Sequence, residues 1–199
     1  MAFTREQVAE VYVATFNRAP DAAGLDYWVN SSGFTNIEDV ASSFFDSAEA
    51  KAMYPDGTSY TTMVTTAYQN LFGRTPDQGG LDYWVGQLQN GVFSQSLMLQ
   101  ALINGAKDTA DGNDKTMMSN KTTVGLDFAN ASLNDTSLAA SIMSGVTDDS
   151  ATVVAAQSSI AIQSQDSSLP PIPQIPTLAP VFVDDIDYNI DFSVDIFIA

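Results

Sequence analysis

The stretch YVATFNRAPDAAGLDYWV at residues 12–29 recurs as YQNLFGRTPDQGGLDYWV at residues 68–85. The offset is 56 residues, and both tryptophans of the chain, Trp28 and Trp84, lie within the two copies. Self-similarity at this kind of spacing is typical of helical repeats whose units pack on one another. We therefore expect two similar helical units in the first half of the chain.

Each copy carries the signals of a helix followed by a turn. Apolar residues at helical spacing lead up to Asn17 in the first copy and to Gly73 in the second. Both residue types favour the left-handed backbone that ends many helices. Pro20 and Pro76 then prevent the helix from continuing.

A second helix is predicted to begin at a shared aspartate. Asp21 and Asp77 are good N-cap residues, and Gly24 and Gly80 on the helix that follows allow close backbone approach. An apolar stripe at i, i+3, i+4 spacing marks the buried side of this helix. The stripe consists of Leu25, Trp28 and Val29 in the first copy, and of Leu81, Trp84 and Val85 in the second.

Further helices complete the expected architecture. Residues 37–53 and 93–106 are each predicted to form the third helix of a unit. Neither unit is large enough to bury its apolar face alone, so the two should pack together. Additional helices are predicted for residues 115–130, 136–144 and 150–164.

The shared arginines, Arg18 and Arg74, stand in the turns between helices. General physical chemistry favours a structural role, in which each arginine bonds turn carbonyls, pairs with a nearby aspartate or stacks on an aromatic ring. The alternative is contact with an anionic ligand. The tyrosines and tryptophans of the copies are likewise interpreted as core residues, with a sugar-stacking platform as the alternative.

The composition excludes several classes of function. Twenty-four acidic against seven basic residues give a formal charge of −17, which argues against nucleic acid as a partner. The chain contains no Cys and no His, which excludes thiol nucleophiles, Cys/His zinc sites and Ser-His-Asp triads. Asp and Glu are abundant enough for a glycosidase-like pair, but no two stand in a context that suggests a cleft. We therefore expect no enzyme.

A polar loop between the repeats and the later helices is a candidate calcium site. Its oxygen-bearing side chains and a glycine resemble part of a calcium loop, although the full twelve-residue EF-hand pattern is missing. The alternative is an acidic turn that caps the next helix. The candidate ligands are Asp108, Asp111, Asn113 and Asp114.

The C-terminal part of the chain differs from the rest. Five prolines in residues 169–180 predict an extended linker. The segment that follows alternates apolar and polar residues with period two, which predicts a single β-strand with one apolar and one acidic face. The apolar face consists of Ile186, Tyr188, Ile190, Phe192, Val194 and Ile196.

A lone strand can neither bury its apolar face nor satisfy its backbone hydrogen bonds. We therefore expect it to stay unfolded until it finds a partner, or to pair with another copy of the chain. Stacked copies would bring Asp187, Asp191 and Asp195 into rows that repel one another unless a cation bridges them. Calcium is the candidate cation for these carboxylates too.

The expected fold class is mainly α, with two homologous helical repeats, additional helices, a proline-rich linker and a C-terminal β-strand. The expected division of the chain is a tandem repeat domain at 1–110, additional helices at 111–168, the linker at 169–180 and the strand tail at 181–199. No run of about 18 apolar residues is present, so we expect no membrane-spanning helix.

The segment Gly73–Trp84 closely resembles an uncharacterised repeat domain with the motif G-R-x-P-D-x-x-G-L-x-Y-W. That domain occurs in large bacterial surface-layer, RTX-type and other type I-secreted proteins. The first copy departs from it in having Asn17 where glycine is usual. The resemblance covers roughly residues 1–110 and implies a helical module of exported proteins, tied in some relatives to the cell surface through lipopolysaccharide. It implies no catalytic residues.

Two features of the termini agree with type I export. Residues 1–8 lack the basic and apolar regions of a signal peptide, and residues 195–199 (DIFIA) resemble an uncleaved C-terminal secretion signal. Glycine- and aspartate-rich RTX nonapeptides are absent from the sequence.

We expect a secreted extracellular structural protein that self-assembles into a surface layer, filament or matrix through its C-terminal strand. The alternative is a module that binds cell-surface polysaccharide and is exported by type I secretion. In both cases the protein would be extracellular or on the cell surface. In the first case its partner is another copy of itself.

Overall fold

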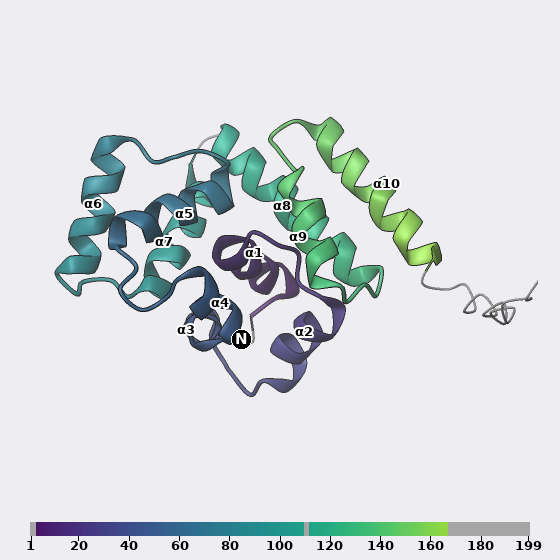
Figure 1. The fold of residues 1–199 in the computed structure, drawn as a ribbon, viewed down its shortest axis with the longest axis horizontal. Helices are drawn as coiled ribbons and strands as arrows, with labels where there is room; N and C mark the ends of the chain where they lie inside the picture. The colour runs from purple at the N-terminus through teal and green to yellow at the C-terminus, as the bar shows by residue number, and fades with distance from the viewer. Residues whose placement is uncertain (1–2, 110–111, 167–199) are drawn as a thin grey trace, which may run out of the picture. The chain divides into compact units, whose positions relative to one another are not determined.

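The computed structural model describes residues 3–109 and 112–166, and every regular element in these ranges is helical (Figure 1). The prediction of a mainly α protein is therefore confirmed for this part of the chain. The predicted linker at 169–180 and the predicted strand tail at 181–199 lie outside the described residues.

The helices follow the order that the sequence predicts. The first copy and the residues that follow it form α1 (Arg5–Phe16), α2 (Ala22–Asp26), the π-helical turn η1 (Tyr27–Ser31), α3 (Ile37–Asp46) and α4 (Ala48–Met53). The second forms α5 (Tyr60–Phe72), α6 (Gln78–Gln89) and α7 (Gln95–Asp108). The additional helices are α8 (Asn113–Asn130), α9 (Thr136–Ser144) and α10 (Ser150–Asp166).

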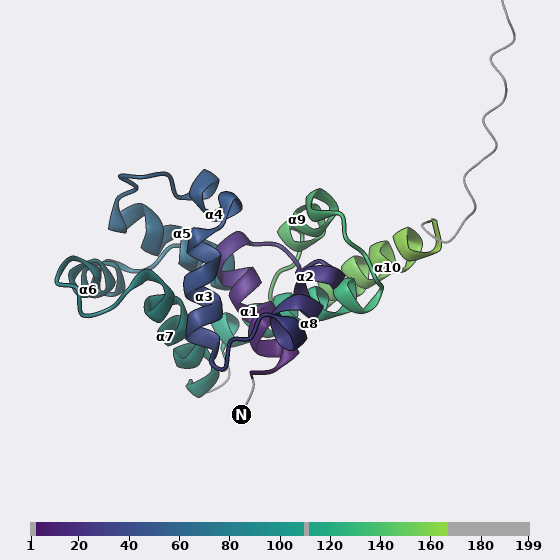
Figure 2. The same cartoon turned by 90° about the horizontal axis from the view of Figure 1, so that it is seen from below.

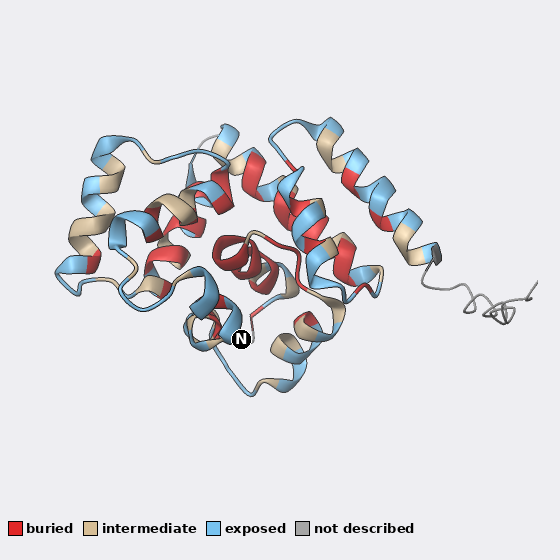
Figure 3. Cartoon of the chain, in the orientation of Figure 1, coloured by how far each residue is buried: buried red, intermediate tan, exposed pale blue. Residues whose placement is uncertain are grey.

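Helix α1 lies at the centre of the packed helices (Figure 3). Every residue from Val8 to Phe16 is buried, because α1 contacts α3, α5, α7 and α8 on its several sides. Its sequence is apolar on nearly all faces, as expected of a helix surrounded by others. The charged residue among those buried in α1 is Glu10, whose carboxylate lies 2.6 Å from Lys107 Nζ. Burial raises the pKa of Glu10, and the hydrogen bond from Lys107 partly offsets this effect.

The segment predicted as one helix at 37–53 is two helices in the structure. Ser47 has an extended backbone (ψ 154°) and interrupts the helix, and its side chain accepts a hydrogen bond from the Ala50 N–H. A serine that can cap a new helix competes with continuation of the old one. The break matters because it places Glu49 in the first turn of a separately oriented helix.

Helix α10 packs along α8 and also contacts α9. Figures 1 and 2 both show it at the opposite end of the helical unit from α6. In the part of the chain that the structure describes, no helix is both long enough and apolar enough to cross a membrane.

Candidate ligand-binding site

The turns of the two copies have the predicted local structure. Asn17 and Gly73 adopt positive φ values of 49° and 66° at the C-terminal ends of α1 and α5. Asp21 and Asp77 then accept hydrogen bonds of 2.7 Å from the N–H groups of the glycines three residues later. The capping predictions are therefore confirmed at all four positions.

Gly24 is required by close packing. A Cβ atom at this position would lie 2.6 Å from the Tyr12 hydroxyl, closer than real Cβ contacts allow. At Gly80, a Cβ would lie 3.3 Å from the Tyr68 hydroxyl, which is a tight but milder contact. The second copy is therefore less closely packed than the first at the same point of the motif.

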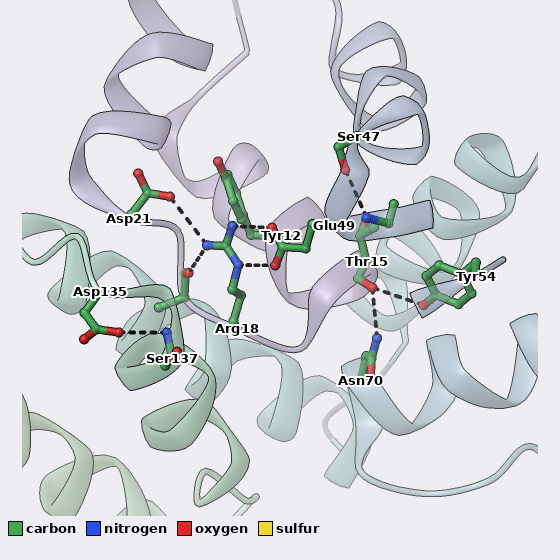
Figure 4. Close-up of polar contacts among 12 residues, drawn as sticks. Tyr12, Thr15, Arg18, Asp21, Ser47, Glu49, Tyr54, Asn70, Asp135 and Ser137 are labelled. Atoms are coloured by element: carbon green, nitrogen blue, oxygen red, sulfur yellow. Dashed lines mark hydrogen bonds and ion pairs between the residues drawn. The ribbon is translucent and has the colours of Figure 1, made fainter. Parts of the chain in front are cut away.

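Arg18 is buried at the centre of a polar cluster (Figure 4). Its Nε and Nη2 groups donate hydrogen bonds of 2.6 and 2.7 Å to the two carboxylate oxygens of Glu49, and Nη1 donates to the Ala19 carbonyl at 2.9 Å. Asp21 is 3.5 Å away, and the guanidinium lies 4.9 Å from the centre of the Tyr12 ring. Burial alone would lower the pKa of Arg18, but the hydrogen bonds and charge of Glu49, together with Tyr12 and Asp21, outweigh burial and raise it. These are the contacts that the structural interpretation of this arginine predicts.

The aromatic side chains of the first copy pack on one another. The ring of Phe44, from α3, lies 4.7 Å from that of Tyr12, 5.3 Å from Phe16 and 5.1 Å from Trp28, measured between centroids. The indole N–H of Trp28 donates a 3.2 Å hydrogen bond to the Tyr12 hydroxyl. Phe44 thus occupies the space between α1 and the tryptophan.

The second copy has a smaller residue where the first has Phe44. The third helices are aligned by their N-caps, Asn36 and Ser94, which are 58 residues apart because the second helix of the second copy (Gln78–Gln89) is two residues longer than residues 22–31 of the first. This alignment places Leu102 at the position of Phe44. The exchange of an aromatic ring for a shorter aliphatic side chain removes part of the filling between α5 and Trp84.

A pocket of about 270 Å³ opens at this place in the second copy. We call it the Trp84 pocket. It is lined by Tyr68, Phe72, Arg74, Trp84, Ala101, Leu102, Gly105, Ala106, Thr109 and Asp114. Three aromatic rings therefore stand opposite small residues of α7, and an ion pair stands among the lining residues.

Arg74 repeats the bonding of Arg18 in a more open setting. Its Nε and Nη2 groups donate to both carboxylate oxygens of Asp114 at 2.7 and 2.6 Å, and Nη1 donates to the Thr75 carbonyl at 3.1 Å. The side chain of Arg74 is 47% exposed, whereas that of Arg18 is 7% exposed. The hydrogen bonds that Arg74 donates to Asp114 raise the pKa of Arg74. A guanidinium and a carboxylate thus line the Trp84 pocket within reach of solvent.

The candidate calcium ligands are only partly brought together. Asp108 ends α7, while Asn113 and Asp114 begin α8, and Asp111 lies outside the described residues. Asp114 pairs with Arg74, a role different from calcium binding. Within residues 3–109 and 112–166, no three Asp or Glu residues form a group suited to a metal ion. The candidate tail ligands Asp187, Asp191 and Asp195 lie outside this range, as does the predicted strand at 186–196.

A buried lysine, not foreseen from the sequence, joins three helices. Lys121 of α8 is 3% exposed and donates hydrogen bonds to the Asn17 side-chain oxygen at 2.7 Å and the Asn70 carbonyl at 2.6 Å. The Asn70 side chain in turn donates to the Ala14 carbonyl at 3.0 Å. It also donates to the Thr15 carbonyl at 3.3 Å, which accepts a second bond of 3.1 Å from Tyr54 (Figure 4). The ends of α1 and α5 are thus held by side chains from elsewhere in the chain.

Sequence reasoning also missed Glu49 and Leu102. Glu49 stands 31 residues from Arg18 and carries no local signal, so its partnership could not be read from spacing. Leu102 could have been found by extending the alignment of the two copies through the third helix with a two-residue gap. Lys121 could have been noticed as a single charge among the apolar positions of α8.

Comparison with known proteins identifies the family. The sequence profile of the family described as "Domain of unknown function (DUF4214)" matches residues 3–54 and again residues 41–109. The two matches together cover more than half of the chain, which therefore belongs to this family. One copy of the motif falls in each match. No match was found among the curated proteins or among the solved structures.

Proposed function

We propose that this protein is an extracellular module that binds cell-surface polysaccharide through the Trp84 pocket. The observation that carries the proposal is the contrast between the two copies, which we interpret as homologous repeats of one unit. The aromatic residues of the first copy are packed around Phe44, whereas the matching residues of the second copy line an open pocket. Close packing of the helices does not by itself require an open pocket next to Trp84.

The chemistry of the pocket suits a sugar ring. Aromatic side chains offer flat apolar surfaces, and that of Trp84 can stack on the C–H face of a sugar. Arg74 and Asp114 supply donors and acceptors for hydroxyl groups. The volume of about 270 Å³ is slightly below the usual range for ligand pockets (about 300–1,000 Å³) and suits one residue of a polymer rather than a large cofactor.

Filling the pocket tests this function. Leu102→Phe restores the residue that the first copy has at this position, so the second copy should accept the ring. We expect the variant to keep its helical content and lose at least about 90% of its affinity for bacterial surface polysaccharide, a change of about 1.4 kcal/mol. Binding is measured by calorimetry against purified lipopolysaccharide O-chains and capsular polysaccharides.

Two tryptophan variants give a second test, in which Trp84→Ala changes the pocket and Trp28→Phe is the control. Loss of a stacking wall in Trp84→Ala should weaken binding, while Trp28→Phe, in the packed first copy, should leave it unchanged. Equal binding by the wild type and Leu102→Phe would exclude the pocket as the binding site. Failure of the wild type to bind any of these polymers would contradict the function itself.

A second candidate function is self-assembly, favoured by the apolar and acidic alternation of residues 186–196. In this proposal the strand pairs with another copy of the chain, and calcium bridges the acidic rows. Export by type I secretion, read from the C-terminus, would deliver the protein to the cell exterior.

Deletion of residues 181–199 is expected to leave a folded helical monomer and to abolish polymers. Electron microscopy shows whether polymers form. The full chain is imaged with calcium and with chelator, and the truncated chain is imaged under the same conditions. Ordered polymers formed by the truncated chain would contradict assembly through the strand.

A further inference from the structure

A second cavity, of about 420 Å³, is lined by residues of α1, α7 and α8, three helices that pack against one another. We call it the Glu10 pocket. It shares no lining residue with the Trp84 pocket. Its volume falls within the usual range for ligand pockets, about 300–1,000 Å³. Met118 and Leu126, on one face of α8, give the pocket an apolar wall.

Charged groups of both signs line the Glu10 pocket. Glu6 and Glu10 lie one turn apart on the same face of α1, while Lys107 is in the last turn of α7 and Lys115 in the first turn of α8. Glu10 is 3% exposed, and its carboxylate lies 2.6 Å from Lys107 Nζ. Lys115 Nζ donates a hydrogen bond of 3.5 Å to the Thr109 carbonyl. Two carboxylates and two ammonium groups therefore border one cavity.

The two carboxylates are not a feature of the repeated unit. At the offset of 56 residues, the second copy has Thr62 and Thr66 in α5 where the first has Glu6 and Glu10 in α1. The matching helix of the second copy thus forms without charge at these positions. A buried ion pair contributes little to stability on average, because the cost of desolvation offsets the attraction. A role in the pocket accounts for Glu10 better than packing does.

The electrostatics of the pocket favour a ligand that carries both charges. Burial is the main cause that raises the pKa of Glu10, and the negative charge of Glu6 adds to it. An ammonium group between the two carboxylates would offset their repulsion. A ligand with net negative charge would be repelled by a chain whose formal charge is −17. A ligand with one ammonium and one carboxylate has no net charge and can use the lysines as well.

We propose that the Glu10 pocket binds a free aliphatic amino acid. The ammonium of the ligand contacts the two glutamates, its carboxylate contacts the two lysines, and its side chain lies on Met118 and Leu126. Insertion of the ligand replaces the ion pair between Glu10 and Lys107 by two ion pairs, so both buried charges remain paired. The inference goes beyond sugar binding at the Trp84 pocket and does not depend on it.

Calorimetry of the full chain with three related small molecules tests the proposal. L-leucine carries both charges, isoamylamine lacks the carboxylate, and isocaproate lacks the ammonium. We expect saturable binding of leucine and an affinity at least about ten-fold lower for each analogue, because each loses one set of ion pairs.

Glu10→Gln removes one charge from the pocket and keeps the size of the side chain. We expect it to lower the affinity for leucine by at least about ten-fold. Glu38→Gln is the matched control, because it changes the net charge equally at an exposed position of α3 and should leave binding unchanged. Glu6 is exposed, so Glu6→Gln should fold and should weaken binding by about three-fold. Circular dichroism checks the helices of each variant.

The possible outcomes separate this site from its alternatives. Equal affinity for leucine and for either analogue would show that one charge is enough and would overturn an amino acid as the ligand. Equal losses in Glu10→Gln and Glu38→Gln would place the effect in the net charge and overturn the site. Absence of leucine binding to the wild type would overturn the proposal altogether. Leu102→Phe, which fills the Trp84 pocket, should bind leucine like the wild type, so a failure of sugar binding is told apart from a failure here.

Discussion

Arg18→Ala will lower the free energy of unfolding by about 2–4 kcal/mol, whereas Arg74→Ala will lower it by less than about 1 kcal/mol. The two arginines occupy the same motif position and each bonds a carboxylate and a turn carbonyl. Both guanidinium groups lie over the motif tyrosine, Tyr12 or Tyr68, but Arg18 is buried and Arg74 is half-exposed. Water can replace much of what Arg74 does, whereas the buried position of Arg18 leaves water less access to the groups that it contacts.

We expect Arg18→Ala to cost less free energy of unfolding than the loss of one partner of a fully buried ion pair would. Glu49, the partner left behind, is 41% exposed and can be solvated after the arginine is removed. The remaining cost comes from the buried Ala19 carbonyl and the lost packing on Tyr12 and Phe16. Urea unfolding of the two variants gives the comparison. Equal losses of stability would show that the packed first copy is no more dependent on its arginine than the open second copy.

The stability of the wild type relative to Lys121→Met will increase by about 2.5 kcal/mol between pH 7 and pH 10. Burial lowers the pKa of Lys121 from its ordinary value of 10.5 to about 8. Its two partners are neutral oxygens at the C-terminal ends of α1 and α5, where helix dipoles favour the charged amine without a full counter-charge. Between pH 8 and 10.5 the unfolded chain therefore binds more protons here than the folded chain, and stability rises with pH.

Two buried tyrosines lower the stability of the folded chain as the pH rises above about 10. Burial raises the pKa values of Tyr12 and Tyr54 from 10.0 to about 12. Above pH 10 the unfolded chain loses these protons first, so stability falls. We expect the wild type to gain stability up to about pH 10 and to lose it beyond, while Lys121→Met shows only the loss. The urea concentrations at the unfolding midpoint, measured for both proteins across this pH range, show whether stability rises or falls with pH. A flat difference between the two proteins would mean that Lys121 is not desolvated in the folded state.

Much of the local structure could be predicted because it depends on residues close together in sequence. The caps at Asn17 and Asp21 follow from backbone preferences over a few positions, and α9 has the predicted bounds. The break at Ser47 was missed because an apolar helical pattern continues through it, and only the serine cap shows that the helix restarts.

The candidate site could not be predicted because it depends on contacts between distant segments. Asp114 lies 40 residues from Arg74, and Lys121 lies 104 residues from Asn17. Periodicity and spacing hold no information on such pairs. The pocket lies where Leu102 stands in place of a ring, a difference between the copies that the sequence reveals only when their alignment is extended through the third helices with a two-residue gap.

The most direct measurement is the fluorescence of Trp84 in the variant Trp28→Phe, in which it is the only tryptophan, during titration with surface polysaccharide. A sugar stacked in the pocket changes the environment of the indole. We predict a saturable change in emission that is lost when Leu102→Phe is added. Emission from Trp84 that stays constant while the polysaccharide binds would place the ligand elsewhere and contradict the account.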